Sequence, residues 1–204
     1  MIPGHPQILT CPFCGKEKEI MSILSGNTCR TKLWSDNKLI APMLPRASFV
    51  QKCPHCGKYF ILTRQERRFA KEGCSFEKGL LSYPEMKEAF AQLSQEGYQD
   101  HHEEENVRTM LHHAYNDYYH RGEEHPEIAA EDWELFVNNA KWIIDNVITG
   151  DAIKAEFYRE IGEFDKALSL LDARKPTGNT FLEEIVKTVR TKAENKDNQV
   201  FRIR

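Results

Sequence analysis

Two near-copies of one hexapeptide are the residues in this sequence whose types and spacing most clearly point to chemistry. Residues 11–16 have the sequence Cys-Pro-Phe-Cys-Gly-Lys, and residues 53–58 have the sequence Cys-Pro-His-Cys-Gly-Lys. A two-residue spacer lets both thiolates of a pair reach one metal ion at about 2.3 Å. Proline after the first cysteine fixes the backbone φ, and glycine after the second accepts a left-handed conformation. In an intracellular chain, two such pairs predict a tetrahedral metal site and not disulfides.

These hexapeptides resemble the paired knuckles of the zinc-ribbon family, each of which carries a Cys-Pro-x-Cys-Gly turn. The resemblance covers about the first 63 residues. It implies one structural Zn²⁺ ion, because four cysteines close the coordination shell. The metal ligands that it implies are Cys11, Cys14, Cys53 and Cys56.

Three other uses of these cysteines are less consistent with the sequence. A rubredoxin binds iron through two such knuckles, but the 38 residues between Cys14 and Cys53 are longer than that family requires. A redox dithiol needs a single Cys-x-x-Cys between a strand and a helix, and this motif is duplicated. A catalytic zinc keeps an open coordination position, which four cysteines remove. Cys29 and Cys74 lack a catalytic partner motif, and we expect them to be small buried or inert thiols.

The elements that must position the cysteines are short strands, and helices follow them. Strand-like residues occur at 19–24, 48–52 and 58–63, with an elaborated loop around 33–45, and the charged stretch 64–71 predicts a linker or a helix start. Apolar periodicity and capping signals predict helices at 82–97, 101–121, 129–147, 151–161 and from 180 onward. For the last helix the predicted capping box is Thr180-Phe181-Leu182-Glu183, and residues 200–204 are expected to fray.

The helical part contains one segment with a more specific pattern. Ala155, Tyr158, Gly162, Phe164 and Ala167 have the spacing of a tetratricopeptide repeat, a helix hairpin with small residues where its helices touch. Only one copy is clear, and about three are needed for a solenoid. The sequence therefore predicts an α+β protein, with a small β zinc ribbon at 1–63 and a larger all-α domain of tetratricopeptide-like helical hairpins at 64–204.

A histidine-rich stretch offers a second metal hypothesis. Six of the eight histidines lie between His101 and His125. On a helix, His113, Asp117 and His120 follow the i, i+4, i+7 spacing and share one face, which suits a metal. That face is opposite the apolar stripe, so we expect a solvated polar face instead.

Charge is distributed unevenly along the 204 residues. The net charge is −3, but residues 1–72 carry 12 basic against 5 acidic residues, and residues 73–204 carry 16 against 26. The two parts therefore either dock on each other or take different partners. Binding of nucleic acid by residues 1–72 is one alternative, through basic residues interleaved with aromatics: Lys32, Lys38, Arg46, Lys52 and Lys58, with Trp34, Phe49, Tyr59 and Phe60.

No phosphate-binding loop, dinucleotide fingerprint, nucleophile elbow or zinc-protease motif is present in the sequence. No apolar run approaches the length of a membrane helix, and no secretory signal is visible, so we expect a cytoplasmic protein without membrane contact. The layout resembles uncharacterised bacterial zinc-ribbon proteins with helical C-termini. The sequence thus favours a non-catalytic adaptor or scaffold that meets a protein partner through its helical region. The alternatives are a nucleic-acid-binding protein and a metal-dependent enzyme or redox carrier.

Overall fold

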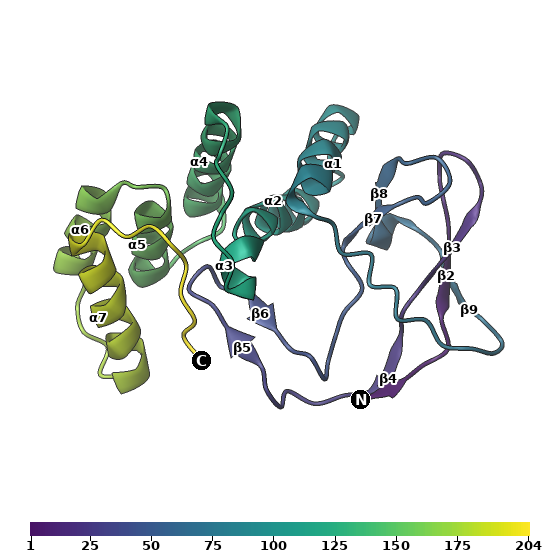
Figure 1. Ribbon diagram of the computed structural model, residues 1–204, viewed down its shortest axis with the longest axis horizontal. Helices are drawn as coiled ribbons and strands as arrows, with labels where there is room; N and C mark the ends of the chain where they lie inside the picture. Colours follow the sequence, from purple (N-terminus) through teal and green to yellow (C-terminus); the bar gives the residue numbers. More distant parts are fainter. The chain divides into compact units, whose positions relative to one another are not determined.

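The computed structural model describes residues 1–204, with short strands in the first third of the chain and helices after them (Figure 1). The α+β class expected from the sequence is confirmed. The strands are β1 Ile2–Pro3, β2 Gln7–Thr10, β3 Glu17–Ile20, β4 Ile23–Ser25, β5 Lys32–Leu33, β6 Leu39–Ile40, β7 Val50–Lys52, β8 Tyr59–Ile61 and β9 Arg67–Phe69. The helices are α1 Tyr83–Glu96, α2 His101–Tyr115, α3 Asp117–Arg121, α4 Ala130–Asn146, α5 Asp151–Glu160, α6 Phe164–Ala173 and α7 Thr180–Glu194.

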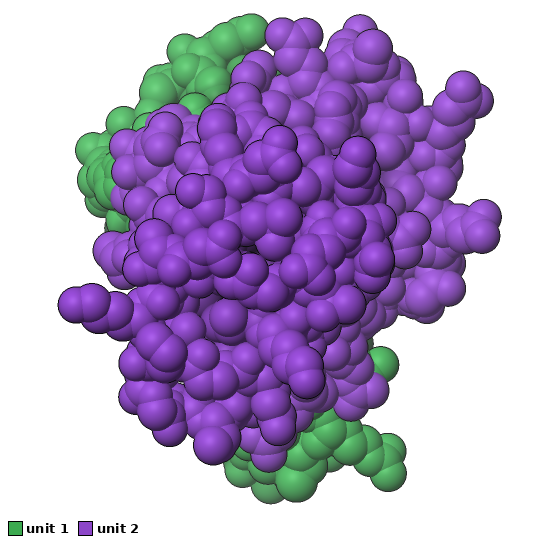
Figure 2. Space-filling view, turned by 90° about the vertical axis from the view of Figure 1, so that its left-hand side faces the viewer, with its two compact units in different colours: residues 1–32, 40–114 green, residues 33–39, 115–204 purple.

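The chain forms two compact units, which Figure 2 colours separately. Unit 1 comprises residues 1–32 and 40–114, and unit 2 comprises residues 33–39 and 115–204. The expected division into domains 1–63 and 64–204 concerns which segments fold independently, and it stays a prediction. No helix of the structure has the length and apolar character required to span a membrane.

Unit 1 contains the antiparallel sheets that carry the cysteines. One sheet has the order β3-β2-β9, and β7 pairs with β8 in another. The stretch 64–71, expected to be a linker or a helix start, instead contains β9, which pairs with β2 from Leu9↔Arg67 to Gln7↔Phe69. Backbone pairing across the sheet outweighs the weak local helix preference of this charged stretch. Leu9, Ile20, Phe60 and Leu62 form a buried core together with two of the cysteines.

Helix α1 packs on the β-sheet part of unit 1. The capping box predicted at its start is present, since Glu85 accepts hydrogen bonds from both the backbone N–H and the hydroxyl of Ser82. Further along, the Gln92 side chain bonds both backbone groups of Tyr59 in β8, at 3.1 and 2.8 Å. The Tyr59 hydroxyl donates to Glu88 at 2.7 Å. These contacts cover the edge of β8 that would otherwise expose unpaired backbone groups.

Unit 2 is built mainly from α4 to α7. The hairpin of α5 and α6 turns at Gly162, whose φ is +79°. Its buried residues pack with those of α7 in one core, formed by Ala155, Ala167, Leu171, Val186, Val189 and Ala193. The hairpin has small residues at its contact, as predicted, while its tetratricopeptide character stays a prediction.

The structure corrects the expected start of helix α7 in unit 2. Helix α7 is capped by Asn179, whose side chain accepts from the Leu182 N–H at 3.2 Å, and not by Thr180. Glu183, the expected box partner, instead binds Arg174. Asparagine is at least as good an N-cap as threonine. The capping-box pattern at 180–183 therefore does not by itself locate the first residue of the helix.

The C-terminal residues 200–204 do not fray as expected. Trp34 forms an antiparallel bridge with Arg202, and the Ile203 N–H donates to the Leu33 carbonyl at 2.8 Å. The Ser35 N–H donates to the Phe201 carbonyl at 2.9 Å. Val200 is buried. Pairing with residues 33–35 satisfies backbone groups that a free tail would leave to water.

Candidate metal centre

Each cysteine pair lies in the tight turn of a hairpin. The first turn joins β2 to β3, and the second joins β7 to β8. In the first, the Cys11 N–H donates to the Lys16 carbonyl at 2.9 Å, and in the second the Cys53 N–H donates to the Lys58 carbonyl at 2.9 Å. Gly15 and Gly57 have φ values of +70° and +74°. The duplicated hexapeptide therefore folds into the same turn twice, with glycine where a left-handed backbone is required.

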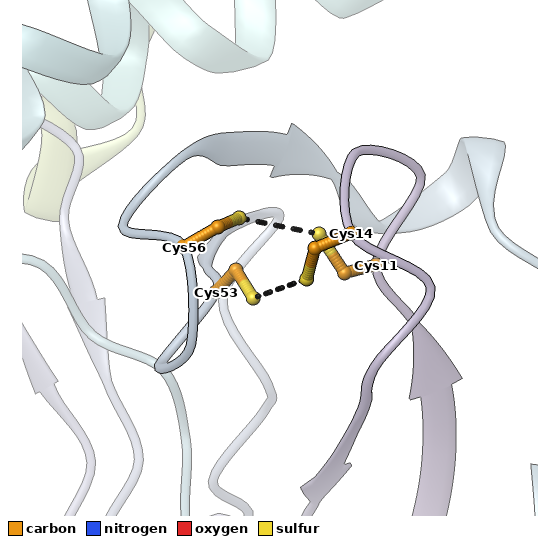
Figure 3. A group of neighbouring side chains, drawn as sticks. All are labelled: Cys11, Cys14, Cys53 and Cys56. Atoms are coloured by element: carbon orange, nitrogen blue, oxygen red, sulfur yellow. Dashed lines mark hydrogen bonds between the residues drawn. The ribbon is translucent and has the colours of Figure 1, made fainter.

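The two turns bring all four sulfur atoms together, from β-hairpins about 40 residues apart in sequence (Figure 3). The Sγ atoms lie within 4.8 Å of one another. Cys11 Sγ is 3.7 Å from Cys56 Sγ, and Cys14 Sγ is 3.6 Å from Cys53 Sγ. A tetrahedron with metal–sulfur bonds of about 2.3 Å has sulfur–sulfur edges of roughly 3.8 Å. The four thiols thus fit a tetrahedral metal ion such as zinc.

The centre is buried on one side and open to solvent on the other. Cys11 and Cys53 belong to the buried core of unit 1, whereas Cys14 and Cys56 are exposed. Each turn therefore supplies one buried and one exposed cysteine to the centre. A metal ion would tie the core strands to the surface turns.

The environment separates the acidities of the thiols. Burial opposes ionisation of Cys53, but hydrogen bonds from the backbone N–H groups of Cys56 and His55 and from neighbouring thiols lower its pKa to about 6. A backbone hydrogen bond at Lys16 favours the Cys14 thiolate, but burial and the other three thiols outweigh it and raise its pKa to about 12. Four thiols this close do not all ionise without a cation to compensate their charge.

The residues around the centre offer no further ligand. His55 is exposed at its turn, and its Nε2 lies 3.3 Å from the Glu17 carbonyl. Cys29 and Cys74 are free thiols and both are exposed, so they are not buried, and that they are inert stays a prediction. Four thiolates fill a tetrahedral shell, and an ion held there would have no open position for a substrate.

The histidine face that suggested a second metal site has a different role in the structure. The predicted single helix 101–121 is broken at Asn116 into α2 and α3. His120 was expected on a solvated face, but its side chain is only 1% exposed. Its Nε2 lies 2.9 Å from a carboxylate oxygen of Asp36, and its Nδ1 lies 2.9 Å from Asp117. His120 is thus a buried imidazole between two carboxylates, which favour its protonated form.

Sequence reasoning missed the residues that bury this histidine. Asp36 is fully buried, and Asn116 donates to it at 3.2 Å and to Glu160 at 3.0 Å. Lys38 pairs with Asp117. These residues lie in unit 2, where the short segment 33–39 contacts α3. The break at Asn116 could have been anticipated only weakly, because asparagine competes with helical hydrogen bonding.

The acidities of this buried cluster follow from its geometry. Burial lowers the pKa of His120, but hydrogen bonds to Asp117 and Asp36 outweigh this and raise it. Burial raises the pKa of Asp117, and His120 and Lys38 more than reverse that effect. Burial, together with the charges of Glu156 and Asp36, raises the pKa of Glu160 well above its ordinary value. These ionisable groups are held together by hydrogen bonds and ion pairs within unit 2.

The aromatics that could stack on nucleic-acid bases are largely enclosed. Tyr59 is 4% and Phe60 3% exposed, and both belong to the interior of unit 1. Trp34 is 9% exposed and lies edge-on to His120 in unit 2. Base stacking requires an accessible ring face. Of the four aromatics, Phe49 alone is not fully buried, and it is half-buried.

Comparison with protein-family models, with curated proteins and with solved structures gave no match.

Proposed function

We propose that this chain is a zinc-binding, non-catalytic module that serves as an adaptor or scaffold for protein partners. The observation that carries the proposal is the closed set of four thiolate donors, whose sulfur–sulfur distances match the edges of a tetrahedron. Such a centre stabilises a fold and offers no position for a reacting group. The metal is one Zn²⁺ ion per chain, in a protein of the reducing cytoplasm.

The surface supports an interaction role. Nine large hydrophobic side chains are exposed, and seven of them belong to unit 1. In unit 2, Phe181 is 47% exposed at the start of α7, next to the tetratricopeptide-like hairpin of α5 and α6. Exposed aromatic and aliphatic groups of this size are typical of surfaces that bind proteins. We propose that the helical region contacts one partner around Phe181.

Metal analysis is the first experiment. Untagged protein purified without added metal should contain one zinc per chain. Iron in its place would give a coloured protein and favour the redox alternative. More than one metal per chain would contradict the single-site proposal. A folded chain without metal would overturn it.

A photo-crosslinking residue placed at position 181 tests the interaction role, with the same residue at position 187 as the control on another side of α7. Phe181 and Lys187 are both exposed. We expect one identified protein to crosslink at 181 alone and to bind the full chain when purified. Equal labelling at both positions would contradict a specific partner site on α7.

Nucleic-acid binding is the alternative that the basic residues of 1–72 support. A Cys₄ zinc centre subtracts two charges, which reduces the excess from +7 to about +5. Labelled oligonucleotide binding by the full chain decides between the two. Binding that is tight at roughly 50 mM salt and falls steeply with added salt would favour this alternative. Its absence at that salt concentration would eliminate it.

A further inference from the structure

Unit 1 contains a cleft of about 540 Å³ that the metal centre does not use. It is lined by strands β4 and β9, by the segment that precedes β2, and by residues 45–47. Leu24 from β4 and Phe69 from β9 are 75% and 64% exposed. Exposed apolar side chains bordering a hollow are characteristic of a binding surface.

The charged residues of the cleft all have one sign. Arg46 and Arg67 line it together with His5, and no acidic residue does. Neither arginine takes part in an ion pair in the structure, and both are exposed. Arg68, the next residue of β9, instead makes a bidentate pair with Glu17, at 2.7 and 2.8 Å. The cleft therefore presents apolar surface beside two uncompensated guanidinium groups, which favour a carboxylate.

The β9 strand also offers unpaired backbone. The sheet order is β3-β2-β9, so β9 pairs with β2 along one edge and has no strand along the other (Figure 1). Successive side chains of a strand point to opposite faces, and Arg67 and Phe69 both line the cleft, while Arg68 faces Glu17. An open strand edge beside side-chain pockets is the surface to which an extended peptide adds as a further strand.

We propose that this cleft binds an extended peptide segment of a partner protein in which every second residue, alternately acidic and apolar, points into the cleft. The peptide backbone pairs with the open edge of β9. Its apolar side chains contact Leu24 and Phe69, and its carboxylates meet Arg46 and Arg67. The proposal rests on the interaction role proposed above, but it assigns a separate surface and a separate partner chemistry.

Charge on an edge strand also has a protective use, because it prevents strands of different molecules from pairing. If protection explained both arginines of β9, Arg67 and Arg68 would be expected to have similar surroundings. The structure distinguishes them, since Arg68 is neutralised by Glu17 and Arg67 is not. Phe69, with 64% of its surface exposed, adds apolar area to an edge that protection alone would keep polar.

Amide chemical shifts of the full zinc-loaded chain, measured by NMR, test the proposal with three short peptides. In the first peptide every second residue is in turn glutamate and valine, with serine between them; in the second peptide lysine replaces each glutamate, and in the third serine replaces each valine. We expect saturable shifts at residues 67–69 and 23–24 with the first peptide alone. Equal shifts with the lysine-containing peptide would contradict the role of the two arginines. Equal shifts with the peptide that lacks valine would contradict the role of the apolar residues and leave only an anion contact.

Variants separate the cleft from the opposite face of the same strand. Arg67→Glu should weaken binding of the glutamate–valine peptide at least about fivefold, because it replaces attraction by repulsion. Arg68→Glu is the matched control and should leave the affinity within about twofold. Zinc content and melting temperature must be the same in both variants. Equal weakening by both, or an absence of binding to the unmodified chain, would overturn the proposal. Neither result bears on the crosslinking at position 181, which tests the interaction role by itself.

Discussion

At the scale of single residues, the six cysteines divide by what surrounds them. Four converge from two identical turns, and two of those four are part of a hydrophobic core. Cys29 and Cys74 are exposed free thiols outside this cluster. A cysteine in the core contributes packing as well as a metal ligand, so its replacement removes both.

Replacing Cys53 by serine should therefore abolish zinc binding and destabilise unit 1. Structural zinc in small domains contributes on the order of 10 kcal/mol of apparent folding free energy, and a hydroxyl is a poor substitute for a thiolate. Cys74→Ser should retain one zinc per chain and the same melting temperature. Elemental analysis and thermal denaturation of both variants measure the two effects. Full zinc content in Cys53→Ser would show that the ligands have been misassigned.

The buried His120 gives unit 2 a defined pH dependence. The pKa of His120 is raised above its ordinary value of 6.5, so its contribution to stability is complete below about pH 6.5 and is lost as the pH rises through the folded-state pKa. The pKa of Asp117 is lowered below 3.8, so its contribution is complete above that pH and is lost as the pH falls through the folded-state pKa. The ion pairs stabilise unit 2 most between these limits.

Asp36→Asn tests this arrangement, because it leaves the buried imidazolium facing a neutral amide. Breaking a buried ion pair costs about 3–5 kcal/mol, and we expect a loss of that order in the free energy of unfolding near pH 6. The difference from the unmodified chain should shrink at alkaline pH, where His120 is neutral. Glu123→Gln breaks an exposed pair with Arg121 and should cost little. A pH-independent effect of Asp36→Asn would contradict a charged His120.

At the scale of elements, helix ends respond to single side chains. Asn179 caps α7 by accepting from the Leu182 N–H. Asn179→Ala should lower the free energy of unfolding by about 1 kcal/mol. Thr180→Ala should change it by less than about 0.5 kcal/mol, since Thr180 is the first helical residue and does not cap. Denaturant titration of both variants distinguishes the two assignments, and a larger effect at position 180 would restore the box predicted from the sequence.

The C-terminal segment is an element without regular structure that is held by pairing with residues 33–35. The Phe201 ring is partly buried beside Arg159 and Lys192. Phe201→Ala should therefore destabilise unit 2 by about 2 kcal/mol, less than the roughly 3–5 kcal/mol for a fully buried aromatic side chain, because Phe201 is only partly buried. Arg202 is exposed and pairs with Trp34 through its backbone. Arg202→Ala should accordingly be nearly neutral in the same thermal denaturation measurement, and equal effects would mean that the segment is held by charge.

Which elements were predictable depends on how far apart in the sequence their determinants lie. The cysteine turns and the capping box at Ser82 are encoded within six and four residues, and both are present in the structure. The strand β9 was not foreseen, because its stability comes from pairing with β2 almost 60 residues earlier. The burial of His120 depends on Asp36, which helical periodicity does not include. Local patterns specify turns and caps, whereas long-range pairing decides which polar faces are buried.

At the scale of the whole molecule, unit 1 contains the four clustered cysteines, helix α1 and helix α2 as far as Ala114. Helix α1 bonds β8 through Gln92 and Glu88, and Glu103 in the first turn of α2 binds Arg64. Metal binding is therefore linked to more of the chain than the 63 residues that the knuckles suggest. Unit 2 contains no cysteine and carries its own buried ion pairs and helical core.

Removal of the metal should consequently affect the two units differently. We expect a chelator to increase hydrogen exchange at the amides of β2, β3, β7, β8 and α1, because their packing depends on the metal-linked turns. Exchange in α5, α6 and α7 should stay within about twofold of that in the zinc-loaded chain. The Cys53→Ser variant should give the same pattern without chelator, and added zinc should restore protection only in the unmodified chain. Loss of protection in α5 to α7 on chelation would show that unit 2 depends on the metal, whereas unchanged exchange throughout would show that the centre contributes nothing to folding.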